Sequence, residues 1–237
     1  MSKTVIFWDF DQTLTIRHTF AEYERGCFLN GETDSELYVL GKQHFENNRK
    51  IFPEDTDVKA PPLFAHDDQH AISAIATFHN NPSFIAGFVS KRLHQELILH
   101  HIIYSDTTPS VAVSFYAVER LNTPFLISWI PAIGHDFAET IGKLQSQHIY
   151  KNHQLSLLRQ NLIPDYLEPT ALIHFCDDSV VNVDVAATLP FPLVGYYVDP
   201  QQSRLSLRQA FYPSNYLSEQ AMVMTLLNNQ NLDMDTN

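Results

Sequence analysis

The sequence predicts an α/β fold: a doubly wound, Rossmann-like parallel sheet with helices on both faces and a small cap or flap insertion. Two observations lead to this prediction. Short apolar runs of strand length alternate along the chain with segments of helical length, which is typical of parallel α/β proteins. Three of these runs end in acidic or hydroxyl side chains, as expected where the strands of a parallel sheet meet a ligand. We expect a single domain over residues 1–228 and a polar tail over residues 229–237.

The composition narrows the function classes. The 237-residue chain has 15 Lys and Arg against 27 Asp and Glu, a formal net charge of −12, which argues against nucleic acid as a partner. Its two cysteines, Cys27 and Cys176, imply no disulfide framework. No apolar stretch approaches the ~20 residues that span a bilayer, and the first residues lack the apolar core of a signal peptide. We therefore expect a soluble, cytoplasmic protein without a membrane span.

The first predicted strand is Thr4–Trp8, a continuous run of β-branched and aromatic residues that suits a strand buried on both faces. The run ends abruptly in two acids, Asp9 and Asp11. From residue 17 to residue 65 the pattern is mixed and polar, with scattered aromatic side chains. We interpret these residues as the small cap or flap insertion.

Capping signals and breakers assign the next elements. An aspartate at position 67 or 68 suits a helix N-cap, and Asn80-Asn81-Pro82 suits a helix stop. The apolar run that follows the proline reads as a buried strand leading into Ser90. The expected elements are a helix over residues 71–79, a strand over residues 83–89 and a helix over residues 93–103.

The second half of the chain continues the alternation. Its predicted strands cover residues 111–118, 124–130, 171–176 and Leu193–Val198, and its predicted helices cover residues 138–149, 154–162, 181–187 and 218–228. The strand at residues 171–176 ends in an acidic pair, Asp177 and Asp178.

The acids at the strand ends suggest a cation site. The carboxyl ends of parallel strands meet at one crevice, so Asp9 and Asp11 concentrate negative charge there. Burying such charge is costly unless a cation compensates for it. Mg²⁺ suits the site because it takes oxygen ligands, needs only one or two carboxylates and leaves room for a substrate phosphate.

These residue types also suit phosphoryl transfer. Asp9 can attack phosphorus and form an aspartyl-phosphate, while Asp11 can protonate the leaving oxygen and later deprotonate the attacking water. Ser90 can donate a hydrogen bond to a phosphoryl oxygen. Lys151 precedes a helix that leads to the Asp177-Asp178 strand and can supply a positive charge for phosphate, although Lys143 is an alternative.

Four segments resemble the motifs of the haloacid dehalogenase superfamily, in the family's order. VIFWDFDQTLT resembles motif I (hhhhDxDxT), FIAGFVSK resembles motif II, Lys151 stands where motif III has its lysine, and HFCDDS resembles motif IV. The segments span most of the chain, from Val5 to Asn182. The sequence departs from the family pattern at Gln12, where many members have Gly, and at Lys91, where a small residue or Asn is common.

The resemblance implies a Mg²⁺-dependent phosphohydrolase. It makes Asp9 the nucleophile and Asp11 the acid and base, with the backbone carbonyl of Asp11 on the metal. It places Ser90 and Lys151 on the phosphate. It also implies that either Asp177 or Asp178 binds the metal.

The substrate is less specified, because cap insertions select it in this family. We prefer a phosphorylated protein, including phosphotyrosine, whose ring could stack on Phe20 or Tyr23. A sugar or nucleotide phosphatase is the alternative enzyme, and a catalytically silent binding module on the same fold is the alternative from another class. A phosphoacceptor signalling domain fits less well, because its phosphorylated Asp normally lies on a later strand. A zinc site is also conceivable, built from His100 and His101 with His94 or His79, but no paired metal-ligand spacing supports it.

Overall fold

A computed structural model describes residues 3–19, 32–60, 62–132, 134–163 and 165–209 of the chain. Several predicted features lie outside these residues: the aromatic side chains of Phe20 and Tyr23, Cys27, the helix over residues 218–228 and the polar tail over residues 229–237. Among the helices that the structure describes, none is both long enough and apolar enough to cross a membrane.

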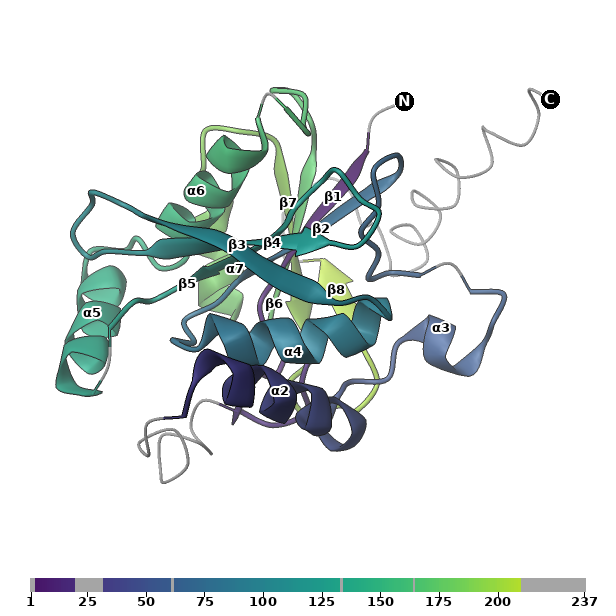
Figure 1. Cartoon of the computed structure of the whole chain (residues 1–237). Helices are drawn as coiled ribbons and strands as arrows, with labels where there is room; N and C mark the ends of the chain where they lie inside the picture. The colour runs from purple at the N-terminus through teal and green to yellow at the C-terminus, as the bar shows by residue number, and fades with distance from the viewer. Residues whose placement is uncertain (1–2, 20–31, 61, 133, 164, 210–237) are drawn as a thin grey trace.

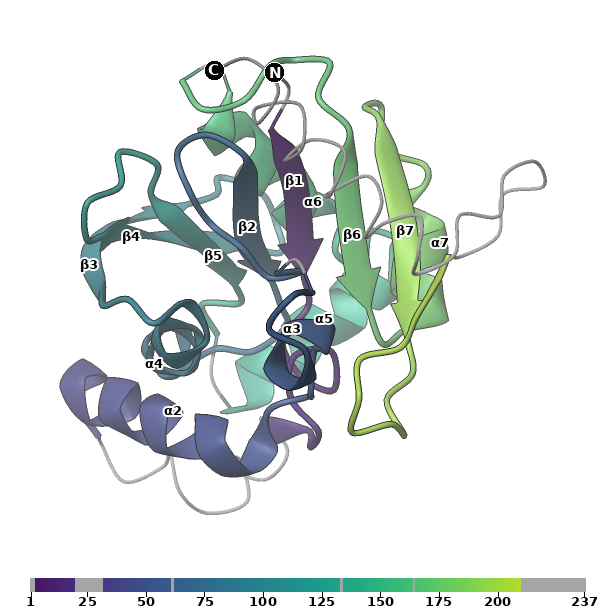
Figure 2. The ribbon, with the colours of Figure 1, turned by 90° about the vertical axis from the view of Figure 1, so that its right-hand side faces the viewer.

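The structure has the predicted fold class, a doubly wound, Rossmann-like α/β fold around one eight-stranded sheet (Figures 1 and 2). The strand order is β3-β4-β5-β2-β1-β6-β7-β8. The five central strands, from β5 to β7, are parallel, whereas β3 and β4 at one edge and β8 at the other pair antiparallel. The strands are β1 Thr4–Trp8, β2 Ala71–Ala76, β3 Leu97–Tyr104, β4 Ala112–Val118, β5 Phe125–Trp129, β6 Ile173–Asp177, β7 Leu193–Val198 and β8 Leu207–Gln209.

Helices cover both faces of the sheet, as expected for parallel strands. They are α2 Asp34–Asn48, α3 Pro53–Thr56, α4 Pro82–Leu93, α5 Gly134–Ser146, α6 Asn152–Leu162 and α7 Val180–Ala186. The central strand β1 is buried along its whole length and divides its side chains between two cores. Ile6 and Trp8 pack on the side of α2 and α4, whereas Val5 and Phe7 pack on the side of α6 and α7.

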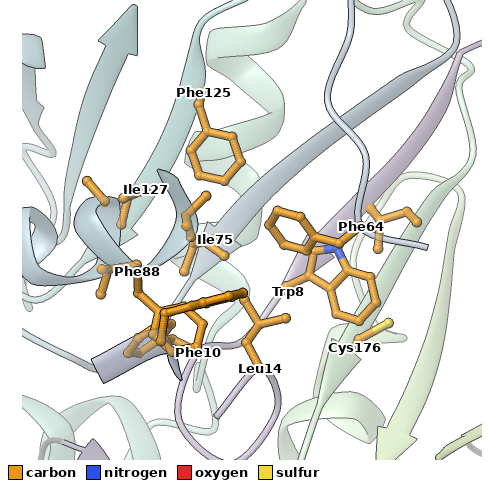
Figure 3. Close-up of a cluster of buried hydrophobic side chains, with 14 of the residues drawn as sticks. Trp8, Phe10, Leu14, Phe64, Ile75, Phe88, Phe125, Ile127 and Cys176 are labelled. Atoms are coloured by element: carbon orange, nitrogen blue, oxygen red, sulfur yellow. The ribbon is translucent and has the colours of Figure 1, made fainter. Parts of the chain in front are cut away.

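Figure 3 shows the core on the side of α4, where Trp8 lies between Phe64 and Cys176. The indole ring of Trp8 lies 5.7 Å from the ring of Phe64, measured between centroids. Phe10, just beyond the strand, packs edge-on against Phe88 of α4 with 5.2 Å between centroids. This aromatic layer fixes β1 against α4 and so sets where the chain emerges after Trp8.

The described part of the predicted cap or flap, residues 17–65, contributes α2 to this same layer. α2 begins with a capping box at Thr33, whose hydroxyl accepts a hydrogen bond from the amide of Glu36 (3.3 Å). It packs so closely on α4 that a Cβ atom at Gly41 would lie 1.9 Å from the carbonyl oxygen of Phe84. Gly87 of α4 makes the reciprocal close approach to α2.

Three of the predicted elements are wrong. Residues 71–79 contain strand β2 rather than a helix, residues 83–89 lie in helix α4 rather than in a strand, and residues 93–103 contain most of strand β3 rather than a helix. Pro82 occupies the first turn of α4, so Asn81-Pro82 starts a helix instead of ending one. The carboxylate of Asp67 accepts hydrogen bonds from the amides of a turn, including that of Gln69 (2.7 Å), and caps no helix.

The predictions for residues 111–198 are confirmed, with shifts of a few residues at the element ends. Strands β4, β5, β6 and β7 and helices α5, α6 and α7 all occur where expected.

Candidate active site

The strand order places a topological switch point beside β1. The chain leaves β1 for β2 on one side and returns much later to β6 on the other side. Ligands of open α/β sheets bind at such a point, outside the carboxyl ends of the strands. The amide of Asp9 donates to the carbonyl oxygen of Cys176 (2.8 Å), so the ends of β1 and β6 lie side by side. Asp9 follows β1, Asp177 is the last residue of β6, and Asp178 is next in the chain.

A tight turn after β1 orients its two acids. The amide of Leu14 donates to the carbonyl oxygen of Phe10 (3.0 Å), and Gln12 lies between them in the left-handed region, with φ of 59°. This backbone conformation favours glycine, and Gln12 adopts it at the position where the resemblance led us to expect Gly. The hydroxyl of Thr13 donates back to Asp9 Oδ2 (3.4 Å).

Lys151, the residue before α6, joins the ends of β1 and β6. Its ammonium group contacts Asp9 Oδ1 and donates to Asp177 Oδ2 (2.8 Å), and its side chain is only 2% exposed. Burial by itself would lower the pKa of Lys151, but the two carboxylates raise it above its ordinary value. Lys151 is therefore positively charged at neutral pH.

One lysine does not neutralise the buried acids around it. Burial raises the pKa of Asp9 to about 7 although Lys151 opposes the shift, and the charge of Asp178 adds to the rise. The pKa of Asp178 is also raised, by burial and by Asp177. The cluster therefore lacks positive charge.

Asp177 and Asp178 have different surroundings. Asp177 is fully buried, and its carboxylate accepts hydrogen bonds from Lys151, from the amide of Ser179 (2.8 Å) and from Asn182 Nδ2 (3.0 Å). Asp178 lines the cleft beside Asp9. Asp177 thus orients Lys151, while Asp178 faces the space where a ligand can bind.

Asp11 has its own set of partners in the segment that follows it. Asp11 Oδ1 accepts hydrogen bonds from the amide (2.7 Å) and the hydroxyl of Thr19, and Asp11 Oδ2 lies 3.3 Å from His18 Nδ1. Burial would raise the pKa of Asp11, but the hydrogen bond from His18 and the nearby histidine charges outweigh it and leave the pKa below its ordinary value. The same hydrogen bond to Asp11 raises the pKa of His18.

A hydroxyl group was expected to reach the cleft from the end of a strand. The structure places the hydroxyl of Thr77 there, a residue that the sequence did not single out. Thr77 directly follows β2 and lines the cleft together with Asp9, Asp11 and Lys151. Its hydroxyl accepts a hydrogen bond from the amide of His79 (3.1 Å). The apolar run of residues 71–76 followed by a threonine was the available signal, but a fully buried run of six residues is not distinguished from a helix by its periodicity.

Ser90 is not brought to this cleft. It lies in α4, is 3% exposed, and its hydroxyl donates to the carbonyl oxygen of Gly87 (2.7 Å) within the same helix. The prediction that Ser90 ends a strand is therefore wrong, because the segment FIAGFVSK forms the interior of a helix.

The cleft at the switch point encloses about 260 Å³. We call its polar lining residues the floor: they are Asp9, Asp11, His18, Thr77, His79, Lys151, Asp178 and Asn182. We call its apolar lining residues the wall: they are Phe78, which follows Thr77, with Phe137 and Ile141 of α5. Gln145, one further turn along α5, also lines it.

The alternative residues lie elsewhere. Lys143 stands on α5, is half exposed and pairs with Glu139 (2.6 Å). Among the side chains that the structure describes, two groups come close enough together to hold a metal ion: Asp9 with Asp177 and Asp178, and an exposed group on α5 made of His135, Asp136 and Glu139. The proposed zinc ligands on β3, His100 and His101, belong to neither group.

The buried acidic group fits a hard divalent cation. The carboxylate oxygens of Asp9, Asp177 and Asp178 lie within 4.8 Å of one another, and carboxylate oxygens are the ligands that Mg²⁺ prefers. Because Asp177 is already engaged by three donors, Asp9 and Asp178 are the residues that would hold the ion.

Fold and site together define a Rossmann-like α/β protein with a carboxylate-rich cleft at its switch point. Comparisons with protein-family models, with curated proteins and with solved structures find no match for this chain.

Proposed function

We propose that this protein is a Mg²⁺-dependent phosphatase that hydrolyses phosphomonoesters through an aspartyl-phosphate on Asp9. The observation that carries the proposal is the arrangement around Asp9, which lies between a buried lysine and a second carboxyl group at the floor of a cleft. The resemblance to haloacid dehalogenase motifs I, III and IV supports the same assignment of Asp9, Asp11 and Lys151.

The chemistry divides between the residues of the cleft. Asp9 Oδ attacks phosphorus, the bond from phosphorus to the leaving oxygen breaks, and Asp11 gives that oxygen a proton. In the second step Asp11 takes a proton from water as the water attacks phosphorus, and the bond from phosphorus to Asp9 breaks. Lys151 and Thr77 stabilise the phosphoryl oxygens throughout. Mg²⁺ held by Asp9 and Asp178, with the backbone carbonyl of Asp11, would supply positive charge that draws the phosphate dianion to Asp9.

The low pKa of Asp11 bears on its role as an acid. With His18 as its partner, Asp11 is ionised in the free protein. The proton for the leaving oxygen then passes to Asp11 from water when the dianionic substrate binds, or from protonated His18 across their 3.3 Å contact. His18 thus positions Asp11 and is also a nearby proton donor to it.

The first test is Mg²⁺-dependent hydrolysis of 4-nitrophenyl phosphate by the wild type, Asp9→Asn and Asp11→Asn. We expect both variants and chelator to lower turnover at least about 10³-fold. Asp11→Asn can still be phosphorylated by an ester with a good leaving group, so an acid-stable, hydroxylamine-sensitive phosphoprotein should accumulate in it and be absent from Asp9→Asn. Thr77→Val should lower turnover about 10²-fold, whereas Ser90→Ala, the matched control, should leave it unchanged.

Two results would contradict the proposal. One is undiminished turnover in Asp9→Asn. The other is the absence of wild-type turnover on a panel of phosphopeptides, sugar phosphates and nucleotides despite folded protein and bound Mg²⁺. The second result would favour the catalytically silent binding module. The same panel chooses between a phosphorylated protein, our preferred substrate class, and a small metabolite.

A further inference from the structure

We propose that the apolar wall of the cleft selects substrates whose leaving group is an aromatic ring, so that the preferred esters are aryl phosphates. This inference rests on the proposed phosphatase function and specifies the substrate class of that same site.

The wall begins directly beside the phosphate position. Lys151 Nζ lies 5.2 Å from the centroid of the Phe78 ring, over its face. Because Lys151 also contacts Asp9, the group attached to a phosphoryl bound at Asp9 lies within reach of Phe78. An aromatic leaving group at that place removes apolar surface from water and can stack on the Phe78 ring.

Helix α5 completes the wall and packs against Val111 and Ile130 of the core. Phe137 and Leu144 of this helix belong to that buried cluster, Ile141 packs against it, and Phe137 and Ile141, one turn apart, also line the cleft. Phe137 is 7% exposed, whereas Ile141 is partly exposed. The apolar face that anchors α5 in the core therefore also lines the cleft, and Ile141 is the partly exposed side chain that it presents there.

The α5 side of the cleft offers few hydrogen-bond partners to a sugar leaving group. A sugar brings several hydroxyl groups, each of which needs a hydrogen-bond partner when it leaves water. Of the three α5 side chains that line the cleft, Gln145 is the polar one, and the remaining polar lining, which includes His18, His79 and Asn182, comes from other parts of the chain. The volume of about 260 Å³ also lies below the usual range of pockets for drug-sized ligands, roughly 300–1,000 Å³. A phosphoryl group with one ring suits this space better than a nucleotide does.

The experiment compares esters whose leaving groups differ in apolar area but little in acidity. We expect wild-type kcat/KM to be about tenfold higher for 2-naphthyl phosphate than for phenyl phosphate, because the second ring buries more surface against the wall. Ile141→Asn should bring this ratio close to one, and Gln145→Leu should raise it. Ala138→Asn is the matched control, because it places the same side chain on the exposed face of α5. Its ratio should equal that of the wild type.

The outcomes separate the two proposals. Hydrolysis of both esters with a wild-type ratio near one, or an equal loss on all esters in Ile141→Asn, overturns the aryl preference and leaves the phosphatase function standing. Hydrolysis of no ester overturns the phosphatase function and the aryl preference with it. Phosphotyrosine as the free amino acid and within peptides then distinguishes a small aryl phosphate from a protein side chain as the source of the ring. A higher kcat/KM for peptides indicates the protein.

Discussion

Two lysines are buried among the described residues, and their surroundings shift their pKa values in opposite directions. Lys151, at the floor of the cleft, contacts two carboxylates, and these raise its pKa. Lys50 follows α2 and is also inaccessible, but the partner of its ammonium group is the backbone carbonyl of Asp199 (2.5 Å). Burial lowers the pKa of Lys50 to about 8, because the more distant charges of Asp178 and Asp199 compensate only in part.

The comparison shows that burial alone does not determine the charge of a side chain. Both lysines lose contact with water, and the carboxylates in direct contact with the ammonium group decide the sign of the pKa shift. Lys151 is a permanent positive charge in the site. Lys50 has a structural position, since its backbone amide donates to Leu14 (2.9 Å) and the next residue, Ile51, pairs with Arg204.

The largest expected effect comes from removing the charge at each lysine in turn. Lys151→Met should lower kcat/KM for 4-nitrophenyl phosphate about 10³-fold, because the phosphoryl oxygens lose their cation. Lys50→Met should change kcat/KM less than about threefold, because Lys50 does not line the cleft. Steady-state kinetics of the two variants tests the contrast. Equal losses would show that the two lysines do not differ in function.

The buried histidine His174 extends the comparison to low pH. Burial lowers its pKa to about 4, and its Nδ1 lies 3.0 Å from the Tyr196 hydroxyl. The unfolded chain takes up the proton near pH 6.5 and the folded chain only near pH 4, so the free energy of unfolding should fall as the pH falls through this window. The loss should reach up to about 3 kcal/mol. Denaturant unfolding from pH 7 to pH 4 should show a shallower loss for His174→Asn; identical curves would contradict the prediction.

The two acids after β6 should separate metal binding from the support of Lys151. Asp178→Asn should raise the Mg²⁺ concentration for half-maximal activity about 10–100-fold, because a proposed ligand loses its charge. Asp177→Asn should instead lower the melting temperature in the absence of Mg²⁺, because it leaves Lys151 with one carboxylate fewer in a buried site. Activity against Mg²⁺ concentration and thermal unfolding measure the two effects. The reverse pattern would exchange the roles of the two residues.

A further effect on stability should appear at Lys50 in alkali. The unfolded chain keeps this proton up to about pH 10.5 and the folded chain releases it near pH 8, so stability should rise with pH between these values. Lys50→Met should lack this rise. Paired denaturant titrations of the wild type and Lys50→Met at pH 8 and pH 10 measure the difference, and parallel changes in the two proteins would show that Lys50 does not titrate in this window.

How much of the site the sequence predicts depends on how local each signal is. Asp9 and Asp11 come just after one apolar strand and the pair Asp177-Asp178 closes another, so their meeting at one sheet edge is predicted without knowledge of any contact. Lys151 also reaches this edge as predicted.

The sequence predicted Ser90 at the cleft, where the structure has Thr77, and this error has a different cause. Both runs, residues 71–76 and 83–89, are apolar except for one serine each, so neither shows by its pattern whether it is helix or strand. Only the position of Pro82 in the first turn of α4 distinguishes the two, and the same proline is compatible with a helix stop. The wall of the cleft is beyond sequence reasoning for another reason, because Phe78 and Ile141 meet only through the tertiary packing of α5.

The position of β1 at the centre of the sheet also governs when the cleft can form. Among the described strands β1 comes first in the chain, its neighbour β2 follows much later, and its other neighbour β6 comes only after most of the described residues. Such distant pairings are slow to form, since loop closure precedes the gain from contact. Until β6 is synthesised, one edge of a fully buried, mostly apolar strand stays unpaired, which is a hazard for aggregation. The half of the site that holds Asp9 is thus made well before the half that holds Asp177 and Asp178.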